Sequence, residues 1–142
     1  MVEPSPPTLA HQPIEVDWVA AGEFDAHRQG GPSVRIDADA RSGPSPFDVL
    51  LAAIATCAAT DVVSILQKQR TPVTALHVVV EAQRVDSTPR RLASAVLHFA
   101  IAAPGASSAK VARAVELSVT KYCSVRSSLI ADAPVTWTIE LE

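Results

Sequence analysis

Residues 43–68 carry the mostly apolar run GPSPFDVLLAAIATCAATDVVSILQK. Ser45 is a good helix N-cap, Pro46 suits the first helical turn, and Asp48 follows the cap by three residues, as in a capping box. This pattern predicts a long helix that ends near Gln69. Its first half, residues 49–59, is apolar on every side, which is typical of a helix inside a structure rather than on its surface.

Three strands are expected before this helix. Apolar residues alternate with other residues over 14–20 and again over 34–38, the period of a half-buried strand, and residues 24–28 form a candidate strand between them. The turn at residues 29–32 makes this region a three-stranded meander. Residues 1–12 are proline-rich with little apolar periodicity, so we expect an extended tail followed by a single domain over residues 13–142.

The second half of the chain predicts a hairpin, a helix and a final strand. Residues 73–85 and 92–103 are strand-like runs joined by a turn, and residues 135–141 alternate again. Between them a second helix is expected from about Ser108 to Ile130. Its buried stripe should comprise Val111, Val115, Ser118, Tyr122, Val125 and Leu129. The order βββαββαβ predicts an α+β fold with antiparallel sheets around two long helices.

The apolar first helix also bears on the oligomeric state. One sheet face covers only one side of a helix, and the second helix covers only part of the remainder. A second copy of the chain can cover the rest. We therefore expect a homodimer with extensive burial around residues 49–59.

Composition excludes several classes of protein. The chain has 142 residues, 48% of them hydrophobic, which is enough for a core without disulfides or a structural metal. Twelve Lys and Arg face 15 Asp and Glu without a basic run, so no nucleic-acid partner is expected. No stretch approaches the roughly 18 consecutive apolar residues of a membrane span, and the N-terminus lacks a signal core, so we expect a cytoplasmic protein without a membrane partner.

Few residues carry recognisable chemistry. The four histidines are scattered and neither cysteine has a close cysteine neighbour, so no metal site is expected. No motif for nucleotide binding or serine hydrolysis occurs. Cys57 and Cys123 remain, each on a helix predicted to cross the core. They are either two small buried hydrophobes or a dithiol that reduces an oxidant.

The neighbours of the cysteines leave alternatives open. Asp61 lies four residues beyond Cys57 on the same helix face, where its carboxylate opposes a thiolate unless it orients an arginine or satisfies nearby backbone. Arg126 follows Cys123 by three residues and either favours a thiolate or is a solvated residue at the helix end. Without a cation at the sulfur, burial in an apolar helix should raise the pKa of Cys57.

Two separated motifs resemble one known family. Residues 43–57 and 61–68 closely resemble the central helix of the OsmC/Ohr superfamily (osmotically inducible protein C and organic hydroperoxide resistance protein), and residues 115–118 and 121–125 resemble its second cysteine helix. The resemblance covers nearly all of residues 14–141, including the element order, and is nearest to the general OsmC-like branch. It implies the OsmC-like fold and an intertwined homodimer with active sites at the interface.

The resemblance also implies an activity. Cys57 matches the peroxidatic cysteine and Cys123 the resolving cysteine of a thiol peroxidase that reduces organic hydroperoxides or hydrogen peroxide in oxidative stress defence. An external dithiol restores such an enzyme, and no cofactor is needed. Arg28, with Arg35, lies in the region of the family's activating arginine, and Asp61 is a possible supporting residue. Phe47, beside Asp48, occupies the position of a family glutamate.

Two other functions remain open on the same fold. The first is a binding protein that holds an apolar or electrophilic small molecule and has weak or no peroxidase activity. The second is a family member that has lost catalysis. The distance between the two sulfurs discriminates among them, because a peroxidase of this type needs its cysteines within disulfide reach.

Overall fold

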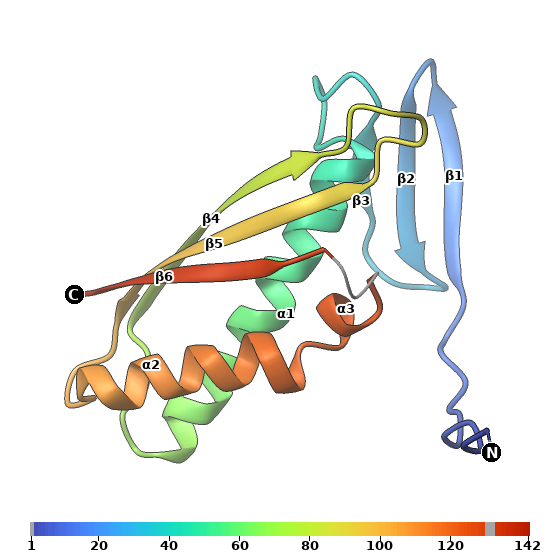
Figure 1. The fold of residues 1–142 in the computed structure, drawn as a ribbon. Helices are drawn as coiled ribbons and strands as arrows, with labels where there is room; N and C mark the ends of the chain where they lie inside the picture. Colours follow the sequence, from blue (N-terminus) through green and yellow to red (C-terminus); the bar gives the residue numbers. More distant parts are fainter. Residues whose placement is uncertain (1, 130–132) are drawn as a thin grey trace. The chain divides into compact units, whose positions relative to one another are not determined.

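The computed structural model describes residues 2–129 and 133–142 of an α+β protein (Figure 1). Its elements follow the predicted order of strands and helices, with the second helix divided into three parts. The elements are β1 (Ile14–Ala20), β2 (Glu23–Arg28), β3 (Val34–Asp37), α1 (Pro46–Lys68), β4 (Ala75–Arg84), β5 (Leu92–Ala102), α2 (Ser108–Leu117), the π-helix η1 (Ser118–Tyr122), α3 (Ser124–Ser127) and β6 (Val135–Leu141).

The chain forms two compact units, Met1–Val49 and Leu50–Glu142. Residues 2–13 contain no helix or strand and are exposed, in the region expected to be a tail. That residues 13–142 act as a single domain stays a prediction.

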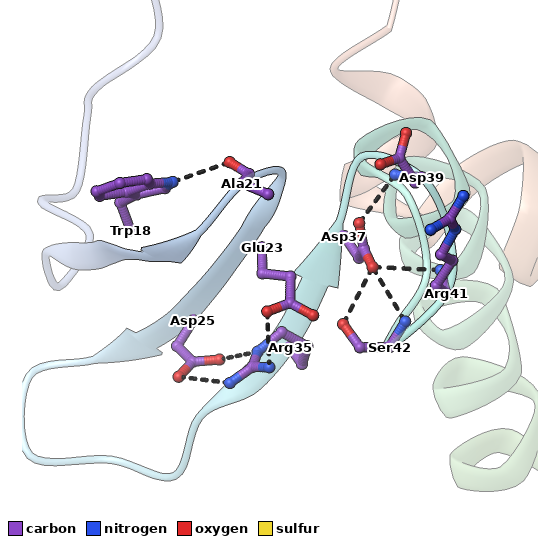
Figure 2. A network of polar contacts seen from close by, with 9 residues as sticks. All are labelled: Trp18, Ala21, Glu23, Asp25, Arg35, Asp37, Asp39, Arg41 and Ser42. Carbon is purple, nitrogen blue, oxygen red and sulfur yellow. Dashed lines mark hydrogen bonds and ion pairs between the residues drawn. The ribbon is translucent and has the colours of Figure 1, made fainter.

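The first unit contains an antiparallel sheet in the order β1-β2-β3, the predicted meander. Trp18 pairs with Phe24, and Phe24 pairs with Ile36, so apolar residues of three strands share one face. The other face is charged: Arg35 Nε lies 2.6 Å from Asp25 Oδ1, and Arg35 Nη1 lies 3.7 Å from Glu23 Oε2 (Figure 2). The alternation therefore separates an apolar from a polar sheet face.

Asp37, buried at the end of β3, organises the loop that leads to α1. Its carboxylate accepts hydrogen bonds from the backbone N–H of Asp39 (2.9 Å), Arg41 (3.3 Å) and Ser42 (3.0 Å), and from the Ser42 hydroxyl (3.1 Å) (Figure 2). These bonds, led by the Ser42 N–H, hold the pKa of Asp37 at about 2. Gly43 follows, where a Cβ would collide with the carbonyl oxygen of Arg35.

The predicted capping box begins α1. Asp48 Oδ2 accepts the Ser45 N–H at 2.9 Å, and Ser45 Oγ accepts the Asp48 N–H at 3.2 Å. The helix ends at Lys68, one residue before the predicted end. Its buried residues lie on one face only, at the helical spacing: Ile54, Ala55, Ala58, Val62 and Leu66.

No membrane span is expected from the sequence, yet α1 is long and apolar enough to cross a membrane. Although charged residues interrupt its apolar run, an 18-residue window of this helix has a mean hydropathy of 2.2, enough to cross a membrane. A single helix of this kind is weak evidence for a span, because the core helix of a globular unit passes the same test. In this structure 28% of that window is buried, on the face of α1 that packs within the second unit.

The second unit is built on the sheet β4-β5-β6, with α1 and α2 alongside it (Figure 1). Alternate residues of β5 are buried, namely Ala95, Leu97, Phe99 and Ile101. They form the core with the buried faces of the two helices. β4 and β5 form the predicted antiparallel hairpin, but β6 runs parallel to β5. The prediction of only antiparallel strands was wrong, because the helical segment between β5 and β6 carries the chain back across the sheet.

The predicted helix from Ser108 to Ile130 is interrupted. α2 ends at Leu117, a π-helical turn follows, and Cys123 has an extended backbone conformation before α3 begins. Ser118 and Thr120 donate side-chain hydrogen bonds to the carbonyls of Ala114 (2.7 Å) and Glu116 (2.6 Å), a pattern that bends helices. As a result Tyr122 is 51% exposed instead of lying in the buried stripe. The predicted endpoint, residue 130, lies outside the described residues.

The Asp37 network predicts a pH-dependent contribution to stability. Since the folded pKa lies below the usual value of 3.8, the stabilisation is complete above that value and is lost as the pH falls towards 2. Asp37→Asn should lower the Tm by several degrees at pH 7, and the deficit should shrink between pH 4 and pH 2. Thermal unfolding followed by circular dichroism measures this, with Asp39→Asn as the control. An Asp37→Asn deficit that is constant with pH would contradict it.

Candidate functional site

The structure brings the two cysteines together. Cys57 lies on α1 and Cys123 at the junction of η1 and α3, both within Leu50–Glu142, and both thiols are free. The two thiols interact: Cys123 lowers the pKa of Cys57, and Cys57 raises the pKa of Cys123. Cys57 is half-buried, whereas Cys123 is 2% exposed. The sequence places the cysteines on two core segments, and the fold makes these segments meet.

The start of α3 surrounds the Cys57 sulfur with hydrogen-bond donors. The Ser124 hydroxyl oxygen lies 3.8 Å from Cys57 Sγ, and the backbone N–H groups of Val125 and Ser124 lower the pKa of this thiol. Burial raises the pKa of Cys57, but the Val125 N–H, the Cys123 thiol and the two Ser124 donors together lower it further than burial raises it. The predicted rise in the pKa of Cys57 was wrong because hydrogen bonds involving Val125, Cys123 and Ser124 favour the thiolate.

Cys123 has the opposite tendency. Burial raises the pKa of the Cys123 thiol, as does its contact with Cys57, and these outweigh the hydrogen bond that the Arg126 N–H donates to its sulfur at 3.4 Å. The thiol hydrogen has two acceptors within reach, the Cys57 sulfur and the Ile54 carbonyl oxygen at 3.8 Å. The pair therefore favours a thiolate on Cys57 and a proton on Cys123.

The break in the second helix makes this arrangement possible. In an uninterrupted α-helix the N–H groups of Ser124 and Val125 would bond to carbonyls four residues earlier. Here the chain leaves the helix at Cys123, whose own N–H bonds to Ser118 O at 2.9 Å, and the next N–H groups are free to face Cys57. Sequence reasoning missed these donors, because neither glycine nor proline marks the break.

Two of the residues considered beside the cysteines, Asp61 and Arg126, lie in the second unit with them. Asp61 lies one turn beyond Cys57 on α1, and its Oδ2 is buried with no hydrogen-bond partner among the described residues. The hydrogen bond to nearby backbone that was considered for Asp61 is therefore not formed by Oδ2 in the described part of the chain. Arg126 acts on Cys123 through its backbone N–H.

The side chains of Arg28 and Arg35 have partners within the first unit. The Nη1 of Arg28 donates to Gln12 Oε1 at 3.3 Å, and Arg35 is held by Asp25 and Glu23. An activating role for Arg28 stays a prediction. Asp48, beside Phe47, bonds to Ser45 as a helix cap.

Over residues 2–129 and 133–142, no three His, Cys, Asp or Glu side chains are grouped closely enough to hold a metal ion.

Known proteins resemble this chain in sequence and in fold. The model of the family described as OsmC-like protein matches residues 38–140. Protein YhfA of Escherichia coli (strain K12) is 36% identical over 127 residues, which cover 89% of this chain and 95% of that protein.

Among solved structures, the OsmC-like protein from Mycoplasma pneumoniae has a TM-score of 0.78 at 17% identity, covering 93% of this chain and 97% of that one. The organic hydroperoxide resistance protein OhrB of Bacillus subtilis has a TM-score of 0.61 at 11% identity, covering 94% and 100%. These two likenesses show the fold, and the match over residues 38–140 together with the identity to YhfA shows the family. The chain belongs to the OsmC-like family of the OsmC/Ohr superfamily.

Proposed function

We propose that this peroxide-related stress protein is a cysteine-based peroxidase, reducing organic hydroperoxides or hydrogen peroxide through a Cys57/Cys123 dithiol–disulfide cycle. The observation that supports this most is the pairing of a half-buried thiol of lowered pKa with a buried thiol of raised pKa. A peroxidatic cysteine needs the thiolate form, and a resolving cysteine needs to stay in contact with it. The proposed setting is oxidative stress defence in the cytoplasm.

The first step oxidises Cys57. Its thiolate attacks one oxygen of the peroxide, an S–O bond forms, the O–O bond breaks, and the other oxygen leaves with a proton as alcohol or water. The sulfur is oxidised by two electrons to a sulfenic acid while the peroxide is reduced. The donors from Ser124 and Val125 stabilise the attacking thiolate before this step.

The second step joins the two sulfurs. Cys123, next to Cys57, attacks the sulfenic sulfur and forms the disulfide, and the hydroxide that leaves takes the Cys123 proton and departs as water. An external dithiol then reduces the disulfide and is itself oxidised. No other cofactor takes part in the proposed cycle.

The proposed enzyme is a homodimer. Ile14, Val16 and Trp18 alternate along β1 and are 54%, 61% and 67% exposed, so one sheet face of the first unit presents a row of large apolar side chains. A second copy of the chain is the proposed cover for this row. The family resemblance also implies an interface at the active sites.

A second candidate function is small-molecule binding without significant peroxidase activity. The observation that favours it is a cavity of about 630 Å³ beside α1, within the size range of small-molecule sites, about 300–1,000 Å³. The peroxidase proposal requires both sulfurs to react, whereas the binding proposal requires neither.

Peroxide consumption tests the proposed activity. With tert-butyl hydroperoxide and dithiothreitol, Cys57→Ser should lower the rate at least about a hundredfold, because the attacking thiolate is lost. Cys123→Ser should retain the first oxidation of Cys57 but form no intramolecular disulfide, as mass spectrometry of the oxidised protein would show. Equal rates for the native chain and both variants would refute the peroxidase and leave the binding function.

The Ser124 hydroxyl should contribute to the reactivity of Cys57. Ser124→Ala removes one donor, so the pKa of Cys57 should rise and its alkylation by iodoacetamide at pH 7 should slow by about threefold to tenfold. Mass spectrometry of the Cys57 peptide across a pH series measures the shift. Ser127→Ala, an exposed hydroxyl on the same short helix, is the control and should match the native profile.

The apolar row on β1 should govern dimerisation. Val16→Glu places a charge on that face and should shift sedimentation towards the monomer, because burying an unpaired carboxylate is unfavourable. Glu15→Gln changes the opposite face of the same strand and should leave the sedimentation coefficient unaltered. A Val16→Glu protein that sediments like the native chain would show that this row is not the interface.

A further inference from the structure

Ser118 is a polar residue in an apolar core. Its side chain is 0% exposed, and it lies in the second unit at the start of the π-helical turn η1. A hydroxyl at such a position loses its hydration, so packing alone favours alanine, as at the buried Ala114 one turn earlier. The cysteine chemistry proposed above gives this hydroxyl no role, although it lies five residues before Cys123.

The Ser118 hydroxyl is bound to the end of α2. It donates a hydrogen bond to the Ala114 carbonyl oxygen at 2.7 Å. The Ser118 N–H also bonds to that oxygen and, in addition, to the carbonyl oxygen of Val115. A serine hydroxyl that bonds to the carbonyl four residues earlier competes with the regular helical pattern and bends the helix.

The backbone widens immediately after this point. The Cys123 N–H bonds to the Ser118 carbonyl oxygen at 2.9 Å, whereas in an α-helix the Tyr122 N–H would bond to it. A residue four places after Ser118 would share its buried face in an α-helix, yet Tyr122 is exposed. Ser118 therefore anchors both ends of the wide turn, because its hydroxyl bonds to α2 and its carbonyl bonds to Cys123.

Two hydroxyls on α1 show that this kind of bond does not by itself end a helix. Thr56 donates to Ala52 O at 2.8 Å and Thr60 donates to Thr56 O at 2.7 Å, and α1 continues past both. These threonines are exposed, so water can replace either bond. Ser118 has no such alternative, because it is fully buried, and its hydroxyl stays on Ala114 while the core is packed.

The wide turn has two consequences for the cysteines. Cys123 leaves the helix in an extended conformation, and its sulfur lies 3.8 Å from the Ile54 carbonyl oxygen of α1. The next two residues are Ser124 and Val125, and hydrogen bonds involving both favour the Cys57 thiolate. In an uninterrupted α-helix the N–H groups of these two residues would bond to carbonyls four residues earlier.

We propose that Ser118 is a positioning residue for the dithiol, whose buried hydroxyl holds the wide turn that places Cys123 and the start of α3 against Cys57. Its relevance to peroxide reduction rests on the proposed function, whereas the placement of the two thiols does not. Ser118 touches no reacting atom and acts through the backbone. Without the hydroxyl, Ala114 O has one donor fewer, and residues 118–122 relax towards regular α-helical bonding, which withdraws the donors of α3 from Cys57.

The ionisation of Cys57 tests this role. Ser118→Ala should fold, because alanine is slightly smaller and is the better helix former. Its pH midpoint for iodoacetamide alkylation, measured on the Cys57 peptide by mass spectrometry, should rise by about half to one pH unit, a loss of thiolate of about threefold to tenfold below the midpoint. Ser118→Thr keeps the hydroxyl and should restore the native midpoint. Thr60→Ala removes the same kind of bond from an exposed position on α1 and should leave the midpoint unchanged.

Disulfide formation gives a second readout that needs no peroxide. Diamide oxidises Cys57 and Cys123 to the disulfide and is itself reduced to a hydrazine, and Ser118→Ala should slow this reaction about tenfold because the two sulfurs are less well placed. A Ser118→Ala protein with a lower Tm but the native midpoint and diamide rate would overturn the proposal, since the hydroxyl would then serve stability alone. If the native chain consumes no peroxide yet Ser118→Ala shifts the midpoint, the positioning role stands and the peroxidase does not.

Discussion

The chemistry proposed for this protein depends on stabilising a thiolate at Cys57, whose side chain is half-buried. Burial opposes the charge on Cys57, and hydrogen bonds involving Val125, Cys123 and Ser124 offset this effect and lower the pKa. Backbone N–H groups are effective donors only when no carbonyl already occupies them. The site therefore requires a place where helical hydrogen bonding stops, and the chain provides it one residue before Ser124.

The core of the second unit fixes where that place lies. α1 buries a face that includes Ile54 and Ala58, on either side of the half-buried Cys57. Cys123 approaches α1 closely enough for its sulfur to lie 3.8 Å from the Ile54 carbonyl oxygen. The same packing that excludes water from Cys123 raises the pKa of its thiol. One contact between two segments thus accompanies pKa shifts of the two cysteines in opposite directions.

The sequence predicts the elements well and the site in part. Alternation and the Ser45 and Asp48 capping box locate the strands and the start of α1, because these signals are local. The parallel pairing of β6 and the break at Cys123 depend on how distant segments pack, which a period of apolar residues does not encode. The pKa of Cys57 was mispredicted for the same reason, since its donors come from residues far along the chain.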